Sequence, residues 1–242
     1  MNKLYFSIVV PAYNESTTIV ETLQYLERLS YPKELYEVIV VENGSTDGTW
    51  ELLQNFNFNG ADFKKYQSRK GVSRAKNLGA QNISEKSDWV VFLDADTILE
   101  SDFLKELNQF LWQQNKKSAV IGTTKVLPYQ NVSQKALWWF KVYDWGHKYT
   151  QTSYSIQICR SDISKNIRYD ETLRLAEDLQ FIWDAKKYGK FFFFPTETVF
   201  TSTRRFEQTG YVRLFFFGYF LASCPDALDQ KSTIKHNGNY VY

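Results

Sequence analysis

The sequence predicts an α/β fold built on a mostly parallel, doubly wound sheet, and two patterns support that prediction. Short apolar runs alternate with amphipathic helical stretches over roughly the first hundred residues, which is the order of parallel strands joined by crossover helices. Three of the apolar runs are followed directly by polar residues, at 11–15, 42–47 and 94–96. Right-handed crossovers bring such strand ends to one edge of the sheet, where open α/β sheets bind their ligands.

The predicted strands are short runs rich in apolar and aromatic residues. The central one is Trp89–Leu93, whose five successive apolar residues are typical of a parallel strand covered on both faces. Proline interrupts strand pairing, so Pro11 is expected to stop the first strand. The full set of predicted strands is 5–11, 37–41, 63–66, 89–93, 119–127, 154–159 and 191–194.

The predicted helices follow from apolar residues at helical spacing and from their end signals. The first helix is expected to end at Tyr31, because the residue before a proline avoids the α conformation. The last helix opens at Glu177-Asp178 and ends with Lys186, Lys187 and Gly189, which suit a helix C-terminus. The full set of predicted helices is 19–30, 49–56, 72–84, 102–116, 132–148 and 177–187.

The composition is that of an ordinary globular protein, long enough for one large domain or two small ones. The 242 residues are 43% hydrophobic and 23% charged, and a net charge of +2 gives no electrostatic preference for nucleic acid. Aromatic residues make up 17% of the chain, which fits carbohydrate handling, membrane proximity or the codon bias of the source. Cys159 and Cys224 match no zinc or redox spacing, which favours a reduced intracellular protein over a disulfide.

The sequence predicts neither a secretory signal peptide nor a membrane-spanning segment. A strand-like segment follows Met1-Asn2-Lys3 directly, without the apolar stretch of a secretory signal. No apolar run reaches the roughly 18–20 residues that a bilayer requires. We therefore expect a cytoplasmic protein, either soluble or peripheral on the inner membrane face.

Two carboxylates, Asp94 and Asp96, follow the central strand at a spacing of two residues. If the backbone stays extended there, both side chains leave on the same side of the sheet edge. Paired acids at such a position suit a hard divalent cation that carries a phosphorylated substrate. A solvated, Asp-rich turn explains the same tripeptide equally well, since Asp is common in turns. The choice between these alternatives depends on the other motifs.

Six short motifs together carry a resemblance to a known family. They are Pro11-Ala-Tyr-Asn-Glu15, Val-Glu-Asn-Gly-Ser-Thr-Asp-Gly at 41–48, Ala75-Lys-Asn-Leu-Gly79, Phe-Leu-Asp-Ala-Asp at 92–96, Glu177-Asp178 and Arg204-Arg205-Phe206. In order and spacing they resemble the family 2 glycosyltransferases, over roughly residues 4–210. Proteins of that family have the GT-A fold, a mixed, mostly parallel sheet flanked by helices. Most of them are inverting enzymes with nucleotide-sugar donors.

The resemblance implies a donor site at the carboxyl edge of the sheet. Asp94 and Asp96, with Ala95 between them, would form the metal and nucleotide site, with Asp96 the expected direct ligand. Mn²⁺ or Mg²⁺ would bridge the two phosphates as Lewis acid and template. Glu42 and Asn43 match the family's nucleoside-binding pair, which is more often Asp-Asp. The other implied donor-site residues are Pro11, Ala12, Tyr13, Glu15, Arg74, Lys76, Arg204 and Arg205.

The resemblance also implies a catalytic base, Asp178, with Glu177 shaping the acceptor site. Inverting transfer needs such a base for the acceptor hydroxyl and positive charge for the departing diphosphate. The alternative is that both acids only complement the dipole at the start of a helix. Arg204 and Arg205 suit diphosphate binding, and the alternative for them is a solvated basic loop.

Three further features leave alternatives open. The aromatic cluster at 138–145 could stack on an acceptor sugar or lipid, although core packing is the preferred interpretation. The segment Tyr211–Ala222 is either an interfacial helix at the membrane or a core or dimer-forming helix. Some relatives supply a third metal ligand from a late histidine, which points to His236, but a surface histidine is the preferred interpretation.

These residues lead to one hypothesis and two rivals. The hypothesis is a metal-dependent inverting glycosyltransferase that uses a nucleotide-sugar, preferably a UDP-sugar, and a glycan or lipid-linked acceptor. The Gln-x-x-Arg-Trp motif of processive synthases is absent, so addition of one sugar per encounter is expected. We expect residues 1–100 to bind the donor, 101–210 to hold the acceptor and the base, and 211–242 to form a separate aromatic helix and tail. The rivals are a non-catalytic nucleotide-sugar or glycan-binding relative and a sugar-nucleotide pyrophosphorylase, whose Gly-rich loop is missing.

Overall fold

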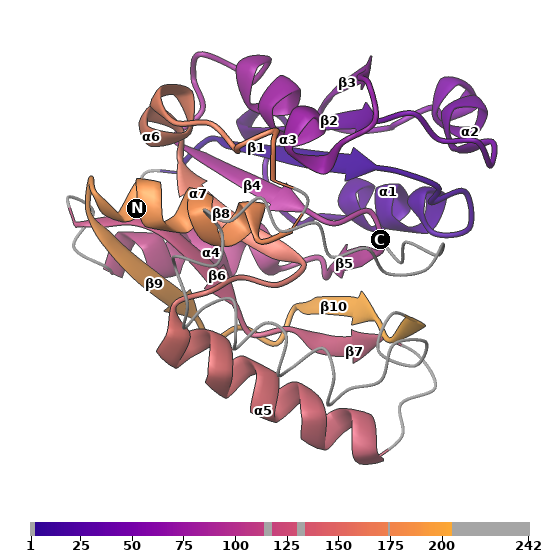
Figure 1. Ribbon diagram of the computed structural model, residues 1–242. Helices are drawn as coiled ribbons and strands as arrows, with labels where there is room; N and C mark the ends of the chain where they lie inside the picture. Colours follow the sequence, from indigo (N-terminus) through magenta and orange to yellow (C-terminus); the bar gives the residue numbers. More distant parts are fainter. Residues whose placement is uncertain (1–2, 114–117, 130–133, 174, 205–242) are drawn as a thin grey trace.

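A seven-stranded sheet in the order β3-β2-β1-β4-β8-β6-β9 forms the centre of the molecule (Figure 1). The computed structural model describes residues 3–113, 118–129, 134–173 and 175–204. Strands β1 to β4 run parallel, as do β6 and β9, whereas β8 is antiparallel to both of its neighbours. The strands are β1 (Phe6–Ala12), β2 (Tyr36–Glu42), β3 (Asp62–Gln67), β4 (Trp89–Leu93), β6 (Ala119–Thr124), β8 (Ile156–Arg160) and β9 (Lys190–Phe194). The sheet is thus mixed and mostly parallel, which confirms the predicted fold class.

Helices cover both faces of this sheet. Successive strand residues point to opposite faces, so Ile8 of β1 packs in a core cluster with α1 and α4, and Val9 packs in a second cluster with α3 and α7. The result is a three-layer arrangement with apolar cores above and below the sheet. The elements are α1 (Ile19–Glu27), the 3₁₀ helix η1 (Lys33–Leu35), α2 (Thr49–Asn55), α3 (Val72–Gln81), α4 (Phe103–Gln113), α6 (Ser161–Asn166) and α7 (Glu177–Lys186).

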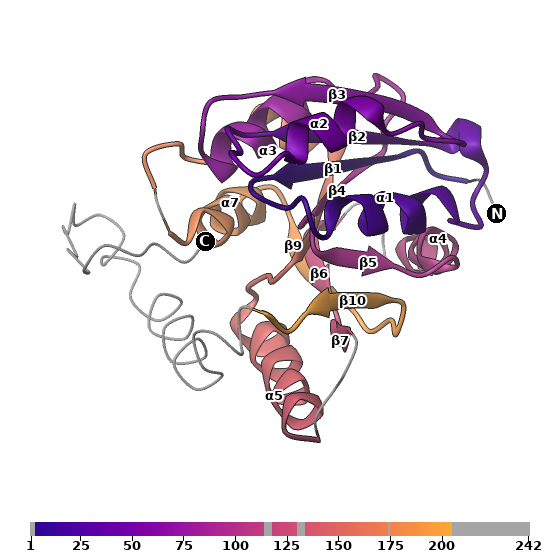
Figure 2. The same ribbon diagram turned by 90° about the vertical axis from the view of Figure 1, so that its right-hand side faces the viewer.

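A smaller sheet and a long helix lie beside the main sheet. The small sheet has the order β5-β10-β7, with β5 (Thr97–Leu99), β10 (Val199–Ser202) and β7 (Leu127–Tyr129). Helix α5 (Gln134–Thr150) lies at the periphery below β7 and β10 in both views (Figures 1 and 2). In the part of the chain that the structure describes, no helix is long and apolar enough to cross a membrane.

The structure corrects three expectations. Pro11 does not stop β1, which continues to Ala12. The pairing of β1 with β4 ends at Val9, so at Pro11 only β2 flanks the strand and a proline is tolerated there. The predicted strand 119–127 is two strands in different sheets, because the chain leaves the main sheet after Thr124. Core packing of the 138–145 cluster holds for Phe140, which is 2% exposed, but is wrong for Trp138 and Trp145. The short elements β5, α6 and β10 were not anticipated.

Candidate active site

The carboxyl ends of β1, β2 and β4 meet at one edge of the main sheet, as predicted. Ala12 is in register with Glu42, and the N–H of Asn43 donates to the carbonyl of Ala12 at 3.0 Å. β4 ends at Leu93, and the N–H of Asp94 donates to the carbonyl of Ser155 just before β8, at 2.9 Å. The polar segments after the three strands therefore lie side by side.

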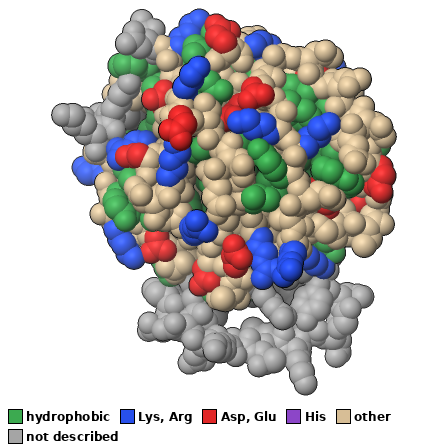
Figure 3. Space-filling model, turned by 90° about the horizontal axis from the view of Figure 1, so that it is seen from above, with side chains coloured by type: hydrophobic (Ala, Val, Ile, Leu, Met, Phe, Trp, Pro, Cys, Tyr) green, Lys and Arg blue, Asp and Glu red, His purple; other side chains and the backbone are tan. Residues whose placement is uncertain are grey.

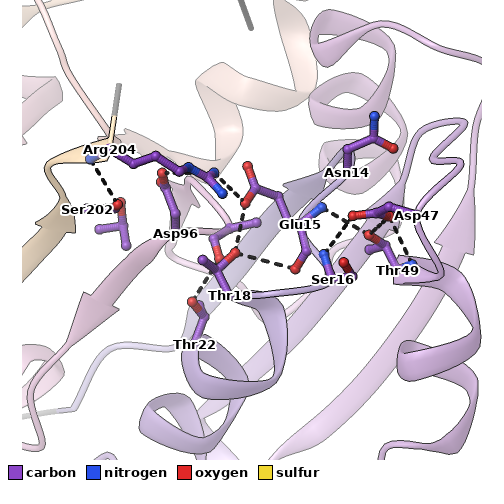
Figure 4. A network of polar contacts seen from close by, with 12 residues as sticks. Asn14, Glu15, Ser16, Thr18, Thr22, Asp47, Thr49, Asp96, Ser202 and Arg204 are labelled. Atoms are coloured by element: carbon purple, nitrogen blue, oxygen red, sulfur yellow. Dashed lines mark hydrogen bonds and ion pairs between the residues drawn. The ribbon is translucent and has the colours of Figure 1, made fainter. Parts of the chain in front are cut away.

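Asp47 ties the loop after β2 to the loop after β1 (Figure 4). Its Oδ2 accepts from the N–H of Ser16 at 3.0 Å, and its Oδ1 accepts from the N–H and hydroxyl of Thr49 at 3.1 and 2.5 Å. Partial burial raises the pKa of Asp47, but these hydrogen bonds outweigh it and lower the pKa to about 2. The sequence motifs predicted no role for Asp47, although an Asp side chain in a turn commonly accepts from the backbone N–H two residues further along.

Glu42 and Asn43 are almost fully buried at the end of β2. The carboxylate of Glu42 accepts from the N–H of Ser45 and from Nε2 of Gln67, the latter at 3.1 Å, so the protein already satisfies it. The side-chain Oδ1 of Asn43 has no hydrogen-bond partner among the described residues. A buried polar atom left without a bond costs roughly 1–3 kcal/mol. A ligand that donates a hydrogen bond here would remove that cost.

Tyr13 and Lys70 form one wall of the same edge. Lys70 Nζ donates to the hydroxyl of Tyr13 at 2.7 Å and lies 4.4 Å from the centre of its ring. Lys70 immediately precedes Gly71, whose φ of +141° favours glycine. This contact of Lys70 could not be predicted, because a lysine before a glycine gives no sign that it will meet an aromatic ring at another strand end.

Two ion clusters lie at this edge, and the first is named here the Arg204 cluster, comprising Arg204, Glu15 and Asp96 (Figure 4). Arg204 Nη2 donates to Glu15 Oε2 at 2.9 Å and lies 3.9 Å from Asp96 Oδ2. The side chain of Arg204 is 39% exposed, whereas those of Glu15 and Asp96 are 11% and 7% exposed. The guanidinium is therefore the part of the cluster that faces solvent and can meet an incoming anion.

The second cluster, the Lys76 cluster, comprises Lys76, Glu177 and Asp178. The Lys76 ammonium lies 2.5 Å from Asp178 Oδ1 and 3.7 Å from Glu177 Oε1, and its side chain is only 5% exposed. Burial alone would lower the pKa of Lys76, but the carboxylates of Asp178, Glu177 and Asp94 raise it above the ordinary value. Lys76 is therefore a fixed positive charge between α3 and α7, and Asp94 connects it electrostatically to the end of β4.

Packing of α3 positions Lys76. A Cβ on Gly79 would lie 2.3 Å from Val9 Cγ1, so only glycine lets α3 approach β1 this closely. Asn77 anchors the helix to the segment before α7, since its Oδ1 accepts from the N–H of Tyr169 and its Nδ2 donates to the carbonyl of Tyr169, both at 2.9 Å. The Ala75–Gly79 motif thereby carries its lysine to the carboxylates of α7.

The first turn of α7 carries the two acids under unusual conditions. The preceding Ala176 has φ 62° and ψ 21°, a left-handed conformation that costs an L-residue about 1–2 kcal/mol. Gln157 of β8 donates from Nε2 to the carbonyl of Asp178 at 3.2 Å. Burial raises the pKa of Glu177 to about 6, the charge of Asp178 adds to this rise, and Lys76 opposes it.

The predicted cations Arg74 and Lys76 both contact carboxylates. Arg74 Nε donates to Glu171 Oε2 at 3.1 Å, and both of these side chains are about half exposed. A diphosphate contact for either cation stays a prediction. Arg205, His236 and the segment 211–222 lie outside the described residues.

Asp94 and Asp96 offer the hard oxygen atoms that Mg²⁺ and Mn²⁺ prefer. They flank Ala95 in a turn closed by a hydrogen bond from the N–H of Thr97 to the carbonyl of Asp94, at 3.0 Å. Within the described ranges, no group of three or more His, Cys, Asp or Glu side chains is arranged to hold a metal. Mg²⁺ commonly binds one or two carboxylates and completes its shell with water and substrate phosphates. The two acids therefore fit an ion that arrives with a diphosphate.

The sheet order and the carboxylates at its carboxyl edge define an α/β protein with the GT-A fold, and solved structures agree. Staphylococcus aureus TarS residues 1–349 in complex with UDP superimpose with a TM-score of 0.67 at 23% identity, over 82% of this chain and 60% of that one. GalNAc-T7 with UDP, GalNAc and Mn²⁺ gives a TM-score of 0.61 at 16% identity, over 83% and 44%. These likenesses concern the fold.

The chain belongs to the family 2 glycosyltransferases. The model of "Glycosyl transferase family 2" matches residues 7–194. A dolichyl-phosphate β-glucosyltransferase of Trichomonas vaginalis is 31% identical over 131 residues, which are 50% of this chain and 39% of that protein. A poly-β-1,6-N-acetyl-D-glucosamine synthase of Staphylococcus epidermidis is 32% identical over 122 residues, covering 50% and 28%. The matched region thus spans well under half of the length of these relatives.

Proposed function

We propose that this chain is a metal-assisted, inverting glycosyltransferase that moves one sugar from a nucleotide-diphosphate sugar to a hydroxyl of a glycan or lipid-linked acceptor. One observation carries the proposal: both ion clusters reach the end of β4, since Asp96 belongs to the Arg204 cluster and the charge of Asp94 acts on Lys76. A donor diphosphate at one cluster and an acceptor hydroxyl at the other would be held by adjacent residues. In this scheme residues 1–100 bind the donor and residues 101–210 hold the acceptor and the base, while the predicted aromatic helix and tail at 211–242 lie outside the described residues.

The donor would bind along the ends of β1, β2 and β4. Asn43 Oδ1 offers a buried acceptor to the nucleoside, and backbone at Pro11 and Ala12 would line the donor site together with Tyr13. UDP-sugars are the preferred donors, a choice supported by the UDP and UDP-GlcNAc complexes of TarS. The glucosyltransferase and N-acetylglucosamine synthase among the relatives support glucose or N-acetylglucosamine as the transferred sugar.

Charge on the leaving diphosphate would be neutralised from the Arg204 cluster. The guanidinium of Arg204 is exposed and can exchange Glu15 for phosphate oxygens, which it binds in a planar, two-pronged fashion. Asp96 and Asp94 would hold Mn²⁺ or Mg²⁺, and that ion supplies Lewis-acid stabilisation of the diphosphate when bound. Arg205 is the second candidate phosphate contact.

Asp178 would serve as the general base. Its Oδ1 is held by Lys76, its side chain is 34% exposed, and the described residues give its second oxygen no hydrogen bond. That oxygen takes the proton of the acceptor hydroxyl while the hydroxyl oxygen bonds to the anomeric carbon. The bond from that carbon to the donor phosphate oxygen breaks, and its electron pair leaves with the diphosphate. Attack opposite the leaving group inverts the anomeric centre, with Glu177 beside the acceptor.

The test combines donor binding with transfer. Thermal stabilisation by UDP-, GDP-, dTDP- and CMP-sugars, each with and without Mn²⁺, should single out one nucleotide and require the metal. Asp178→Asn should then lower the transfer rate by about 10²–10⁴-fold with donor stabilisation retained. Asp184→Asn, on the same helix one and a half turns further, is the matched control and should leave transfer unchanged.

Each alternative gives a different result in the same assays. A shift with a nucleotide-sugar but no transfer to any acceptor would favour the non-catalytic relative. Formation of nucleotide-sugar from sugar phosphate and nucleoside triphosphate would favour the pyrophosphorylase. Loss of donor stabilisation in Asp178→Asn would contradict the assignment of Asp178 as the base.

A further inference from the structure

Helix α5 carries an unusual concentration of exposed apolar side chains. The described part of the chain has seven large hydrophobic side chains that are at least 36% exposed, and four of them lie on α5. Trp138, Trp145 and Tyr149 are 58%, 63% and 65% exposed, and Leu137 is 36% exposed. Such a cluster marks an interaction surface, because single exposed hydrophobic residues are common but grouped aromatic ones are not.

These side chains occupy one face of the helix. The exposed positions follow the helical repeat, which places them along a single stripe. The stripe, named here the α5 face, consists of Gln134, Leu137, Trp138, Lys141, Trp145, Lys148 and Tyr149. Trp145 and Tyr149 are in ring contact, with centroids 4.9 Å apart, and Lys148 lies 5.9 Å from the centre of the Tyr149 ring.

The opposite side of α5 packs against the protein. Phe140 is buried and Asp144 accepts a hydrogen bond from the N–H of Val126 at 3.0 Å. His147 stacks on Tyr154 with ring centroids 6.0 Å apart. The helix is therefore held by one face at the periphery of the molecule (Figure 2), and its aromatic face is left exposed.

Charge decides what can cover the α5 face. Its only charged members are Lys141 and Lys148, and the single acid of the helix, Asp144, faces inward. If a second copy packed on this face by two-fold symmetry, four lysines would come together. The α5 face offers no carboxylate that could form ion pairs with them. An anionic surface pairs them directly. The face seen in Figure 3 differs, because acidic and basic side chains are interspersed over it.

We propose that the α5 face docks this protein on an anionic phospholipid bilayer. Trp and Tyr prefer the boundary between acyl chains and headgroups, where their rings are buried and their polar groups stay hydrated. Lysines among them reach the headgroup phosphates, as in other helices that lie in the membrane plane. This contact involves residues 137–149 and is separate from the earlier expectation for 211–222.

The position of α5 gives this contact a consequence. The chain leaves α5 at Thr150 and reaches β8 after residues 151–155. Just before β8, the carbonyl of Ser155 accepts from the N–H of Asp94. Gln157 of β8 contacts the carbonyl of Asp178. A connection of only five residues therefore links the proposed membrane-docking helix to the strand that contacts the acceptor side of the candidate site. The inference goes beyond the proposed function, and its test needs no sugar transfer.

The test is co-sedimentation of the full chain with vesicles of phosphatidylcholine alone or mixed with phosphatidylglycerol. We expect binding to the mixed vesicles that weakens with salt. The double variant Lys141→Glu/Lys148→Glu should lower the partition coefficient by about tenfold or more. Trp138→Gln/Trp145→Gln should lower it on both vesicle types. Quenching of tryptophan fluorescence by brominated acyl chains should accompany binding and disappear in the tryptophan variant.

Matched controls use exposed side chains elsewhere. Lys105→Glu on α4 and Tyr188→Gln after α7 change side chains that are as exposed as those of the α5 face and should leave vesicle binding unchanged. No binding of the wild type to anionic vesicles would overturn the proposal, as would binding that the α5 variants leave intact. A dimer in solution that the same variants dissociate would assign the face to a second copy.

Discussion

The Lys76 cluster and the Arg204 cluster have the same composition, one cation between two carboxylates, but they differ in exposure. Lys76 is 5% exposed and lies 2.5 Å from its nearer carboxylate, Asp178, whereas Arg204 is 39% exposed and lies 2.9 Å from its nearer carboxylate, Glu15. A buried pair is fixed, because removing either charge leaves the other without solvation. An exposed pair contributes little to stability and is easily exchanged. The same chemistry therefore suits Lys76 to hold the proposed base, Asp178, and Arg204 to exchange its carboxylate partners for a ligand.

Removal of the buried cation should have the largest effect. Lys76→Met leaves Glu177 and Asp178 without a counter-charge, so we expect a loss of about 3–5 kcal/mol in the free energy of unfolding and no measurable transfer. Chemical denaturation with urea measures the loss. Lys105→Met, which removes an exposed pair with Asp102, should change stability by less than about 1 kcal/mol. Equal effects of the two variants would remove the distinction between the clusters.

Neutralising Glu177 should give a pH-dependent gain. Its pKa in the folded protein is about 6 instead of 4.5. Protonation of Glu177 therefore stabilises the folded protein fully below pH 4.5, and this stabilisation is lost as the pH rises through 6. Glu177→Gln does not titrate. Relative to wild type it should therefore gain up to about 2 kcal/mol between pH 4.5 and pH 7. A difference in unfolding free energy that stays constant over this range would contradict the assigned pKa.

Removal of the exposed cation should affect ligand binding more than stability. Arg204→Gln should raise the KM for the donor by about tenfold, since one charge-assisted contact to phosphate is worth roughly 1.5–3 kcal/mol at most. Its melting temperature should stay close to that of the wild type. Arg204→Lys keeps the charge without the planar fork and should recover part of the loss. A large stability loss in Arg204→Gln with unchanged KM would assign Arg204 a structural role.

The smallest effect is expected from a change at Ala176, the residue just before Glu177 and Asp178 of the Lys76 cluster. Ala176 is left-handed, so Ala176→Gly should remove its strain while adding disorder to the unfolded chain, a net change within about 1 kcal/mol in favour of the variant. Thermal melts can resolve this change. Ala185→Gly, in the last turn of the same helix, has no strain to relieve and should only destabilise.

The sequence by itself determined the sheet and its ligand edge. Apolar runs and their polar ends predicted β1, β2 and β4 to within a few residues, because a strand covered on both faces must be continuously apolar. The motifs at 11–15, 41–48 and 92–96 fell at adjacent strand ends for the same reason. Strands β5 and β10 were not predicted, because they are too short to show a periodic pattern of apolar residues. The strand end predicted at Pro11 was wrong, because the sequence does not show which strands flank a given residue in the sheet.

Only the tertiary structure decided which charges meet. Lys76 and Asp178 are 102 residues apart and Arg204 and Glu15 are 189 apart, so no local pattern could pair them. The close approach of α3 to β1 at Gly79 brings Lys76 to Asp178. The chain passes from β9 in the main sheet to β10 in the small sheet, and this path brings Arg204, just after β10, to Glu15. The aromatic face of α5 is a further case. A helical repeat in sequence gives the stripe, but packing of the opposite stripe against β7 and Tyr154 decides which one remains outside.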